Sequence, residues 1–217
     1  MQHDAFDTHA DKYDAWYDTD AGKSIFAMEV DCLKPLLHRH KRPYLEIGVG
    51  SGRFARALGI EYGIDPSPVL LSMAESRGIL SLKAAGEKLP FANGVFGGAL
   101  IALTLCFVDD PATVLQEAWR VLQPGGGLVL GLILKESPWA EFYATRAKEG
   151  HPIYSRAHFF SKGEVENLLR SSGFKLLDYR SVLFQPPGQS IYRPECSVSG
   201  YRESAGFVTI GSRKRGT

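Results

Sequence analysis

Short apolar segments alternate with amphipathic segments along the middle of the chain. The apolar segments predict strands at residues 43–48, 60–65, 80–85, 97–105 and 127–134. Helices are expected between them, at residues 52–59 and 67–78 and from Pro111 onward. Ser67 and Asp110 are good N-caps, and each is followed by a proline at the first helical position. Strands that alternate with helices at this spacing form βαβ units, so we predict a largely parallel sheet.

The flanking regions show the same two periodicities. Helices are expected before the first strand at residues 5–18 and 23–40, and after the fifth strand at residues 137–150 and 161–173. Each of the later helices begins with a serine followed by an acidic residue, Glu141 or Glu164, which we interpret as capping boxes. Two late strands are expected at residues 174–184 and 206–212.

The first predicted helix has an aromatic face. Its apolar residues recur at steps of four, three and four, as on one side of a helix: Phe6, Ala10, Tyr13 and Tyr17. The acidic residues of the same segment are expected on the opposite, solvated side: Asp7, Asp11, Asp14 and Asp18. A face with two tyrosines suits either docking on the core or a contact with a ligand, because a buried hydroxyl needs a partner.

The composition indicates a globular protein without a strong electric field. The chain has 217 residues, of which 44% are hydrophobic and 23% charged, and 25 basic residues balance 24 acidic ones. We therefore predict one domain, with neither nucleic acid nor a membrane as a partner. Three widely spaced cysteines and scattered histidines predict no disulfide framework and no metal site. The acidic N-terminus is unlike a signal peptide, so we expect a cytoplasmic protein.

A glycine-rich turn follows the first predicted strand. Residues 45–53 read LEIGVGSGR, with Gly48, Gly50 and Gly52 just before a helix. Such a turn lets a ligand approach the backbone beside the positive end of the helix. Asp65 ends the second predicted strand, at the edge where open α/β sheets bind ligands. Its carboxylate suits a ribose diol, and the alternative is that it only caps the next helix.

The ordered motifs of this region resemble those of a known enzyme family. The segments YLEIGVGSGRF, GIDPS, GEKLPFANGVFGGAL and VLQPGGGLVLG are similar to the motif set of class I S-adenosylmethionine-dependent methyltransferases, in particular the methyltransferase type 11 family. The resemblance implies a Rossmann-like α/β fold, with a seven-stranded, mostly parallel sheet, helices on both faces and an antiparallel last strand. It implies S-adenosyl-L-methionine as cofactor and S-adenosyl-L-homocysteine as product. The cofactor contacts that it implies are Glu46, Gly48, Gly50, Gly52, Asp65 and Leu70. Further cofactor-binding residues are expected from their positions: Tyr13, Pro66, Gly86, Glu87 and Thr104.

One position departs from the family pattern and keeps two alternatives open. The acid that usually faces the adenine amino group is Ala85 here, although Gly86 and Glu87 remain and Glu87 is a substitute acceptor. A non-catalytic, cofactor-holding partner protein is therefore one alternative to an enzyme. The other is an NAD-dependent oxidoreductase, which is opposed by Arg53 at the position of the third glycine of dinucleotide-binding loops.

The methyl acceptor is expected to be a small molecule, because the chain has neither a recognition domain nor a basic stripe. In-line transfer to such an acceptor relies on positioning and the exclusion of water, so no acid–base motif is required. The candidate residues near the reaction are Cys106, Tyr17 and His158, and Tyr154 lies in the same segment as His158. Cys106 is expected to shape the pocket, and the alternative is an ordinary buried apolar side chain.

The expected organisation is a single methyltransferase domain over residues 1–217, as a monomer or a homodimer. Within it, residues 1–42 form an N-terminal helical lid that lies over the cofactor. Residues 43–134 form the cofactor-binding core, and residues 135–160 form an insertion that caps the substrate.

Overall fold

The centre of the molecule is one mixed sheet. The computed structural model describes residues 4–215, and within these the sheet has eight strands in the order β3-β2-β1-β4-β5-β8-β6-β7. The strands are β1 (Tyr44–Ile47), β2 (Tyr62–Asp65), β3 (Leu80–Lys83), β4 (Phe96–Ala102), β5 (Leu122–Leu132), β6 (Phe174–Val182), β7 (Val198–Ser199) and β8 (Phe207–Lys214).

The direction of the strands agrees with the fold predicted from the motifs. Strands β3, β2, β1, β4 and β5 pair in parallel, whereas β8 is antiparallel to both of its neighbours, β5 and β6. The mostly parallel sheet with an antiparallel last strand is therefore confirmed. The eighth strand is β7, a two-residue segment that pairs with the edge of β6 and was not predicted.

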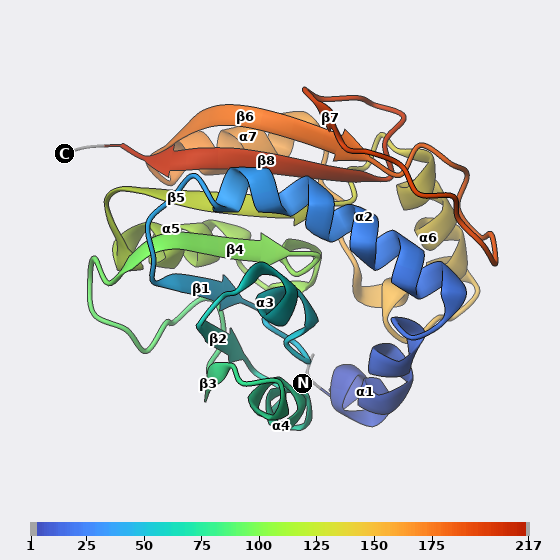
Figure 1. Ribbon diagram of the computed structural model, residues 1–217, viewed down its shortest axis with the longest axis horizontal. Helices are drawn as coiled ribbons and strands as arrows, with labels where there is room; N and C mark the ends of the chain where they lie inside the picture. The colour runs from blue at the N-terminus through green and yellow to red at the C-terminus, as the bar shows by residue number, and fades with distance from the viewer. Residues whose placement is uncertain (1–3, 216–217) are drawn as a thin grey trace.

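Helices cover both faces of the sheet. They are α1 (Asp4–Trp16), α2 (Asp20–Leu37), α3 (Arg53–Leu58), α4 (Pro68–Ser76), α5 (Pro111–Val121), α6 (Pro138–Lys148) and α7 (Lys162–Ser171), with the short 3-10 helices η1 (Leu105–Phe107) and η2 (Tyr154–Arg156). The buried side chains of α2, α3 and α4 belong to one hydrophobic cluster, and those of α5 and α7 to another. Figure 1 shows α2 and α3 in front of the sheet, with α5 and α7 behind it.

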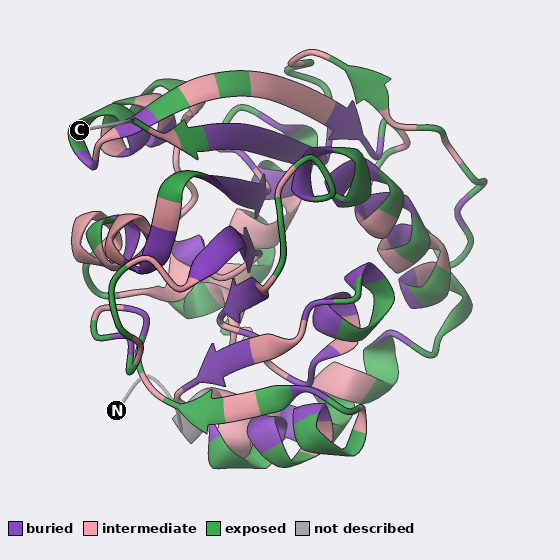
Figure 2. Ribbon diagram, turned by 60° about the vertical axis from the view of Figure 1, so that its left-hand side comes forward, coloured by how far each residue is buried: buried purple, intermediate pink, exposed green. Residues whose placement is uncertain are grey.

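The two clusters lie on opposite faces of the central strands. Every residue of β1 and β4 is buried, whereas most of the edge strand β3 is exposed, as the colours of Figure 2 show. Along β1 the side chains alternate, so that Tyr44 joins one cluster and Leu45 the other. This double burial explains the continuous apolar run of β4. No helix within residues 4–215 combines the length and apolarity needed to cross a membrane.

Two of the predicted boundaries and one predicted cap are wrong. The run 97–105 leaves the sheet after Ala102, because Leu103 takes a left-handed φ of 54° and turns the chain into η1. Strand β5 begins at Leu122, where the sequence suggested a turn, and a register shift in its pairing with β4 accommodates the extra residues. At α6 only the Ser137 side chain caps the helix, because Glu141 lies one residue too far along to complete a box. The capping box of α7 is confirmed.

Candidate functional site

A cavity of about 510 Å³ lies at the carboxyl ends of the central parallel strands. Its lining includes the ends of β1, β2 and β4, and Ile133 just after β5. Helices α1 and α6 lie at this end of the sheet, toward which the arrows of β1 and β4 point in Figure 1. The volume suits a pocket for small ligands, and the position is that of ligand sites in open α/β sheets.

Most of the residues predicted from the sequence meet at this cavity. Those that line it are Tyr13, Tyr17, Glu46, Gly48, Gly50, Asp65, Pro66, Leu70, Gly86, Glu87, Thr104, Cys106 and Tyr154. Gly52 and His158 are not part of the lining. The side chain of His158 is exposed, and its backbone N–H donates to the carbonyl of Cys106 at 2.8 Å. His158 thus attaches the segment before α7 to η1, and its imidazole does not face the cavity.

The three glycines of the loop after β1 serve three different purposes. A Cβ atom on Gly48 would lie 2.2 Å from the Thr104 side chain. No side chain fits at position 48, because β4 ends directly beside the loop. Gly50 has no atom within 4 Å of such a Cβ, and it lines the cavity. Gly52 instead faces Ala74, whose Cα would lie 2.9 Å away, and so lets α4 pack closely against the loop. The role of Gly52 here is packing between elements rather than contact with the cavity.

Asp65 joins the glycine loop to the beginning of α4. Its Oδ2 accepts a hydrogen bond from the backbone N–H of Gly50 and its Oδ1 one from that of Ser67, both at 2.9 Å. The cap of α4 is Ser67 itself, whose hydroxyl accepts from the N–H of Leu70 at 3.1 Å. The carboxylate of Asp65 is therefore fixed in place at the cavity, rather than serving as the side-chain cap of the helix.

Glu46 presents an unsatisfied acceptor to the cavity. Its side chain is 1% exposed, and its Oε2 has no hydrogen-bond partner among the described residues. Burial raises the pKa of Glu46 well above its usual value, and a hydrogen bond from the backbone of Ala55 offsets this only in part. A buried acceptor without a partner is costly, so this position is suited to a ligand that brings a donor or a positive charge.

The end of β4 and the segment before α5 line the cavity next to the glycine loop. The Thr104 hydroxyl lies 3.0 Å from the carbonyl of Ala102 and 3.2 Å from that of Gly48, so its single proton is used within the protein. Burial raises the pKa of the Cys106 thiol to about 12, which keeps it protonated. Glu87 Oε1 accepts from the N–H groups of Asp109 and Asp110 at 3.2 and 3.3 Å, which holds the loop before α5.

Helix α1 is fastened over the cavity by ion pairs. Asp14 is bound by Arg53 at the start of α3 and by Arg77 after α4, with nitrogen–oxygen distances of 2.8 and 2.7 Å. Asp18 also pairs with Arg53, and Asp7 accepts a hydrogen bond from the Ser67 hydroxyl. The prediction of a fully solvated acidic face is therefore wrong: Asp14 is only 15% exposed.

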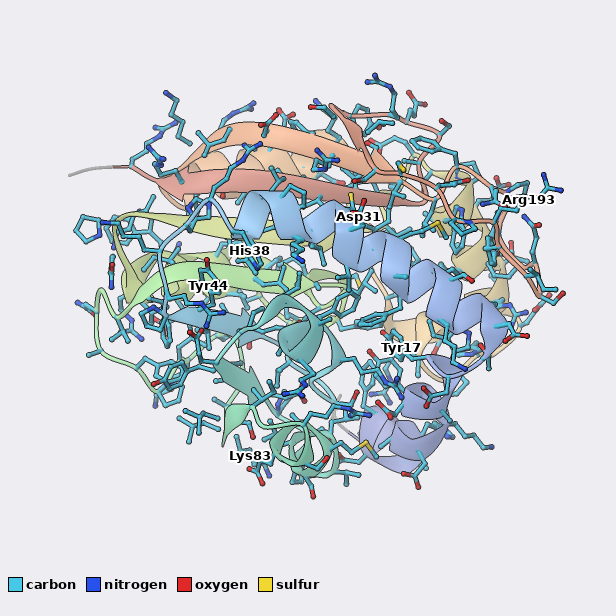
Figure 3. All side chains as sticks on the ribbon, in the orientation of Figure 1. Tyr17, Asp31, His38, Tyr44, Lys83 and Arg193 are labelled. Carbon is cyan, nitrogen blue, oxygen red and sulfur yellow. The ribbon has the colours of Figure 1, made fainter. Side chains whose placement is uncertain are left out.

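The aromatic face of α1 is turned inward, as its periodicity predicted. The Tyr13 and Tyr17 hydroxyl oxygens are 3.3 Å apart, and both residues line the cavity. Figure 3 labels Tyr17 where the chain turns from α1 into α2. At the other end of the helix, the Phe6 ring meets the Phe107 ring of η1 edge-on at 5.3 Å. Burial is the main cause that raises the pKa of both tyrosines, so both hydroxyls remain neutral.

Comparison with known proteins agrees with this geometry. A family model described as a methyltransferase domain matches residues 45–130. An uncharacterized protein of Mycobacterium tuberculosis is 48% identical over 200 residues, which cover 92% of this chain and 70% of that one. An uncharacterized protein of Methanocaldococcus jannaschii is 36% identical over 209 residues, covering 96% of this chain and 98% of the relative.

A solved structure extends the similarity to the whole fold. The crystal structure of a Thermotoga maritima protein, described as an S-adenosylmethionine-dependent methyltransferase and a possible histamine N-methyltransferase, superposes with a TM-score of 0.91. It is 33% identical and the match covers 99% of this chain and all of that one. The chain belongs to the class I S-adenosylmethionine-dependent methyltransferases. This membership opposes the NAD-dependent alternative.

The methyltransferase cavity has a second region, to which the sequence analysis assigned Tyr154 and the cap at residues 135–160 but not Glu29. We call it the acceptor wall and define it as Glu29 of α2, Ile133 after β5, Trp139 and Tyr143 of α6, and Tyr154 of η2. The rings of Tyr143 and Tyr154 are 4.4 Å apart, and Trp139 is 3% exposed. The sequence did carry one signal for this wall, because Glu29 is an acidic residue on the otherwise mainly apolar buried face of α2.

Proposed function

We propose that this methyltransferase transfers a methyl group from S-adenosyl-L-methionine to a small-molecule acceptor inside the cavity. The observation that carries the proposal is the unpartnered, buried Oε2 of Glu46 beside the glycine loop. When bound, the cofactor supplies a methyl group that its positively charged sulfur makes electrophilic. The polar groups around the loop fit such a molecule. The cofactor has one ammonium group and one ribose diol, and the buried carboxyl groups of Glu46 and Asp65 would accept hydrogen bonds from them.

The chain offers a matching residue for most parts of the cofactor. Glu46 would accept from the ammonium group, and Asp65, already oriented by two backbone amides, would accept from the ribose hydroxyls. Gly50 has no side chain, so the cofactor would approach the backbone of the loop closely there. Leu70, 3% exposed at the cavity, would pack against the adenine ring, for which Ala85 offers no side-chain acceptor.

The residues around the acceptor would act by position and by excluding water. Tyr17 and Cys106 are neutral groups at the cavity, because burial raises the pKa of both side chains. Neither is suited to attack the methyl group, and both would shape the space in which the acceptor is held. Helix α1 would be the lid, since Arg53 and Arg77 hold it over the cavity, whereas α2 packs on the sheet against β5, β6 and β8.

Isothermal titration with S-adenosyl-L-methionine, S-adenosyl-L-homocysteine and NAD tests cofactor binding. We expect measurable binding of both adenosyl ligands and none of NAD. A mass-spectrometric search for products heavier by one methylene group, in a metabolite extract supplied with the cofactor, then tests transfer. Histamine belongs in the first set of acceptors because the Thermotoga relative is described as a possible histamine N-methyltransferase. Binding of the cofactor without any methylated product would favour a non-catalytic, cofactor-holding protein instead.

A further inference from the structure

Glu29 is a second buried acid at the cavity that lacks a partner. It lies on α2, is 3% exposed and lines the cavity as part of the acceptor wall. Its Oε2 has no hydrogen-bond partner, and no ion pair is recorded for it among residues 4–215. Asp14, which is also shielded from water, is by contrast paired with two arginines.

The fold itself gains nothing from an acid at this position. Ile25, Cys32 and Leu33 of the same helix are buried in the hydrophobic cluster in front of the sheet. A leucine or methionine at position 29 would extend that apolar surface without the cost of removing a carboxyl group from water. Burial alone raises the pKa of Glu29 to about 8. The absence of a compensating contact from any of residues 4–215 indicates that the compensation comes from a ligand.

The surroundings of Glu29 favour a positive charge. Burial raises the pKa of four nearby tyrosines, and the ionised form of Glu29 adds to this effect: Tyr13, Tyr17, Tyr143 and Tyr154. It has the same effect on the buried thiol of Cys32, the next turn of α2. These phenols and the indole of Trp139 provide aromatic faces, which attract cations. The basic residues that line the cavity are His9, Lys12, His151 and Arg156. Lys12 and Arg156 are exposed, and burial lowers the pKa of His151.

We propose that Glu29 binds a protonated amine of the methyl acceptor, so that the substrates are small amines with an apolar or aromatic body. The inference rests on the proposed function, which assigns the ammonium group of the cofactor to Glu46. Among residues 4–215, two carboxyl groups of the cavity, those of Glu46 and Glu29, have an oxygen without a hydrogen-bond partner, and the cofactor has one ammonium group. The second carboxyl group, on the acceptor wall, is then left for a cation of the other ligand.

Titration with matched ligands tests the charge preference. Phenethylamine, tyramine and butylamine are titrated into the protein saturated with S-adenosyl-L-homocysteine, beside the neutral 2-phenylethanol and the anionic 3-phenylpropanoate. We expect at least one amine to bind about tenfold or more tightly than either of the other two classes. In Glu29→Gln this advantage should disappear while the affinity for S-adenosyl-L-homocysteine stays the same. Asp31→Asn, an exposed acid of the same helix that Figure 3 labels, is the matched control and should behave as the parent.

A proton count separates direct binding from a structural effect. A carboxyl group with a pKa of about 8 is mostly protonated at pH 7, and an ammonium ion bound beside it would ionise it. Binding of the amine should therefore release close to one proton, which appears as a binding enthalpy that differs between phosphate and Tris buffers. In Glu29→Gln the enthalpy should be the same in both buffers.

Three results would overturn the proposal. The first is that no amine of the set binds, or that the neutral analogue binds as tightly. The second is that Glu29→Gln retains the preference for amines. The third is that Glu29→Gln weakens S-adenosyl-L-methionine but not S-adenosyl-L-homocysteine, because Glu29 would then serve the charged sulfur of the cofactor. If the parent protein bound neither adenosyl ligand, the proposed function would fail instead, so the two failures are distinguishable.

Discussion

Arg53 donates two hydrogen bonds of 2.8 Å to the carboxylate of Asp14, one from Nε and one from Nη2. This pair joins the first residue of α3, directly after the glycine loop, to the helix that covers the cavity. Burial on its own would raise the pKa of Asp14, but the hydrogen bonds from Arg53, Ser51 and Arg77 lower it well below the usual range. The contact is therefore fully ionised at neutral pH and is lost only in strong acid.

Breaking this contact should loosen α1. In Asp14→Asn the bidentate pair with Arg53 is lost, so we expect faster hydrogen exchange over residues 5–20 and roughly tenfold weaker binding of S-adenosyl-L-homocysteine. In the parent protein, exchange of the same residues should slow when the ligand binds. Asp11→Asn, an exposed acid of the same helix, is the control and should change neither quantity. Equal protection of α1 with and without ligand would show that it is not a lid.

Asp65 should be the acid on which cofactor affinity depends most. Asp65→Ala removes the acceptor for the N–H groups of Gly50 and Ser67 as well as for the ribose, so we expect a loss of about 1–3 kcal/mol in calorimetric titration. Ser161→Ala removes the cap of α7, away from the cavity, and should lower the melting temperature without changing affinity. If Asp65→Ala lowered the melting temperature without changing cofactor affinity, Asp65 would only hold the glycine loop in place and would not bind the cofactor.

Cys106 should be chemically inert although it lines the cavity. Because burial raises the pKa of its thiol to about 12, we expect no alkylation by iodoacetamide at pH 7.5 in the folded protein. Cys196 is exposed and supplies the positive control in the same peptide map. Cys106→Ala should alter turnover only moderately, through the shape of the pocket. Complete loss of activity with normal cofactor binding would assign the thiol a chemical role.

The Tyr13 hydroxyl should contribute modestly to cofactor binding. It lies 3.3 Å from the Tyr17 hydroxyl and faces the cavity, so Tyr13→Phe removes one neutral hydrogen-bonding group. We expect S-adenosyl-L-homocysteine to bind about 0.5–1.5 kcal/mol more weakly. Tyr179→Phe removes a hydroxyl that donates to Glu166 and does not line the cavity, and it should leave the affinity unchanged. Unchanged affinity in Tyr13→Phe would reject a hydroxyl contact with the ligand.

Glu29 should give the ligand-free protein a characteristic pH dependence. Its pKa is raised from 4.5 to about 8 on folding, so the folded state holds a proton that the unfolded state releases. Stability relative to Glu29→Gln should therefore be highest below pH 4.5 and fall, by on the order of 1.4 kcal/mol per pH unit, until about pH 8. Urea unfolding at pH 5, 6, 7 and 8 measures this difference. If the free energy of unfolding of the parent and of Glu29→Gln changed with pH in the same way, the Glu29 carboxyl group would not be desolvated. Asp31→Asn is the control, and its free energy of unfolding should follow that of the parent.

The sequence predicted the parallel part of the sheet and the glycine-loop side of the cavity because both are encoded locally. Strand β1, its glycine loop and α3 are continuous in the chain, and the alternation of strands and helices predicts that the strands are parallel. Gly50 and Asp65 could be assigned from their positions at strand ends, since parallel strands end at the same edge of the sheet.

The rest depends on contacts between distant segments. The local sequence shows only that Arg53 stands where dinucleotide-binding loops have a third glycine. Its ion-pair partners, Asp14 and Asp18, lie 39 and 35 residues earlier in the chain. Likewise, the sequence predicts that residues 135–160 cap the substrate, but nothing local shows that Glu29 of α2 lines the same cavity as this cap. Polar residues whose partners are remote, or are ligands, therefore remain beyond the reach of pattern analysis.

Helix α2 has a consequence for how such proteins diversify. One turn of it presents Glu29 to the cavity, while Cys32, Leu33 and Leu36 anchor the same helix on the sheet. Because the anchoring residues hold the backbone in place, position 29 is free to change in charge without disturbing the loop that faces the cofactor. If Glu29 binds the acceptor as proposed, a single codon would redirect the enzyme toward a different class of substrate, and a lineage of paralogues would explore new acceptors while inheriting one unaltered donor site.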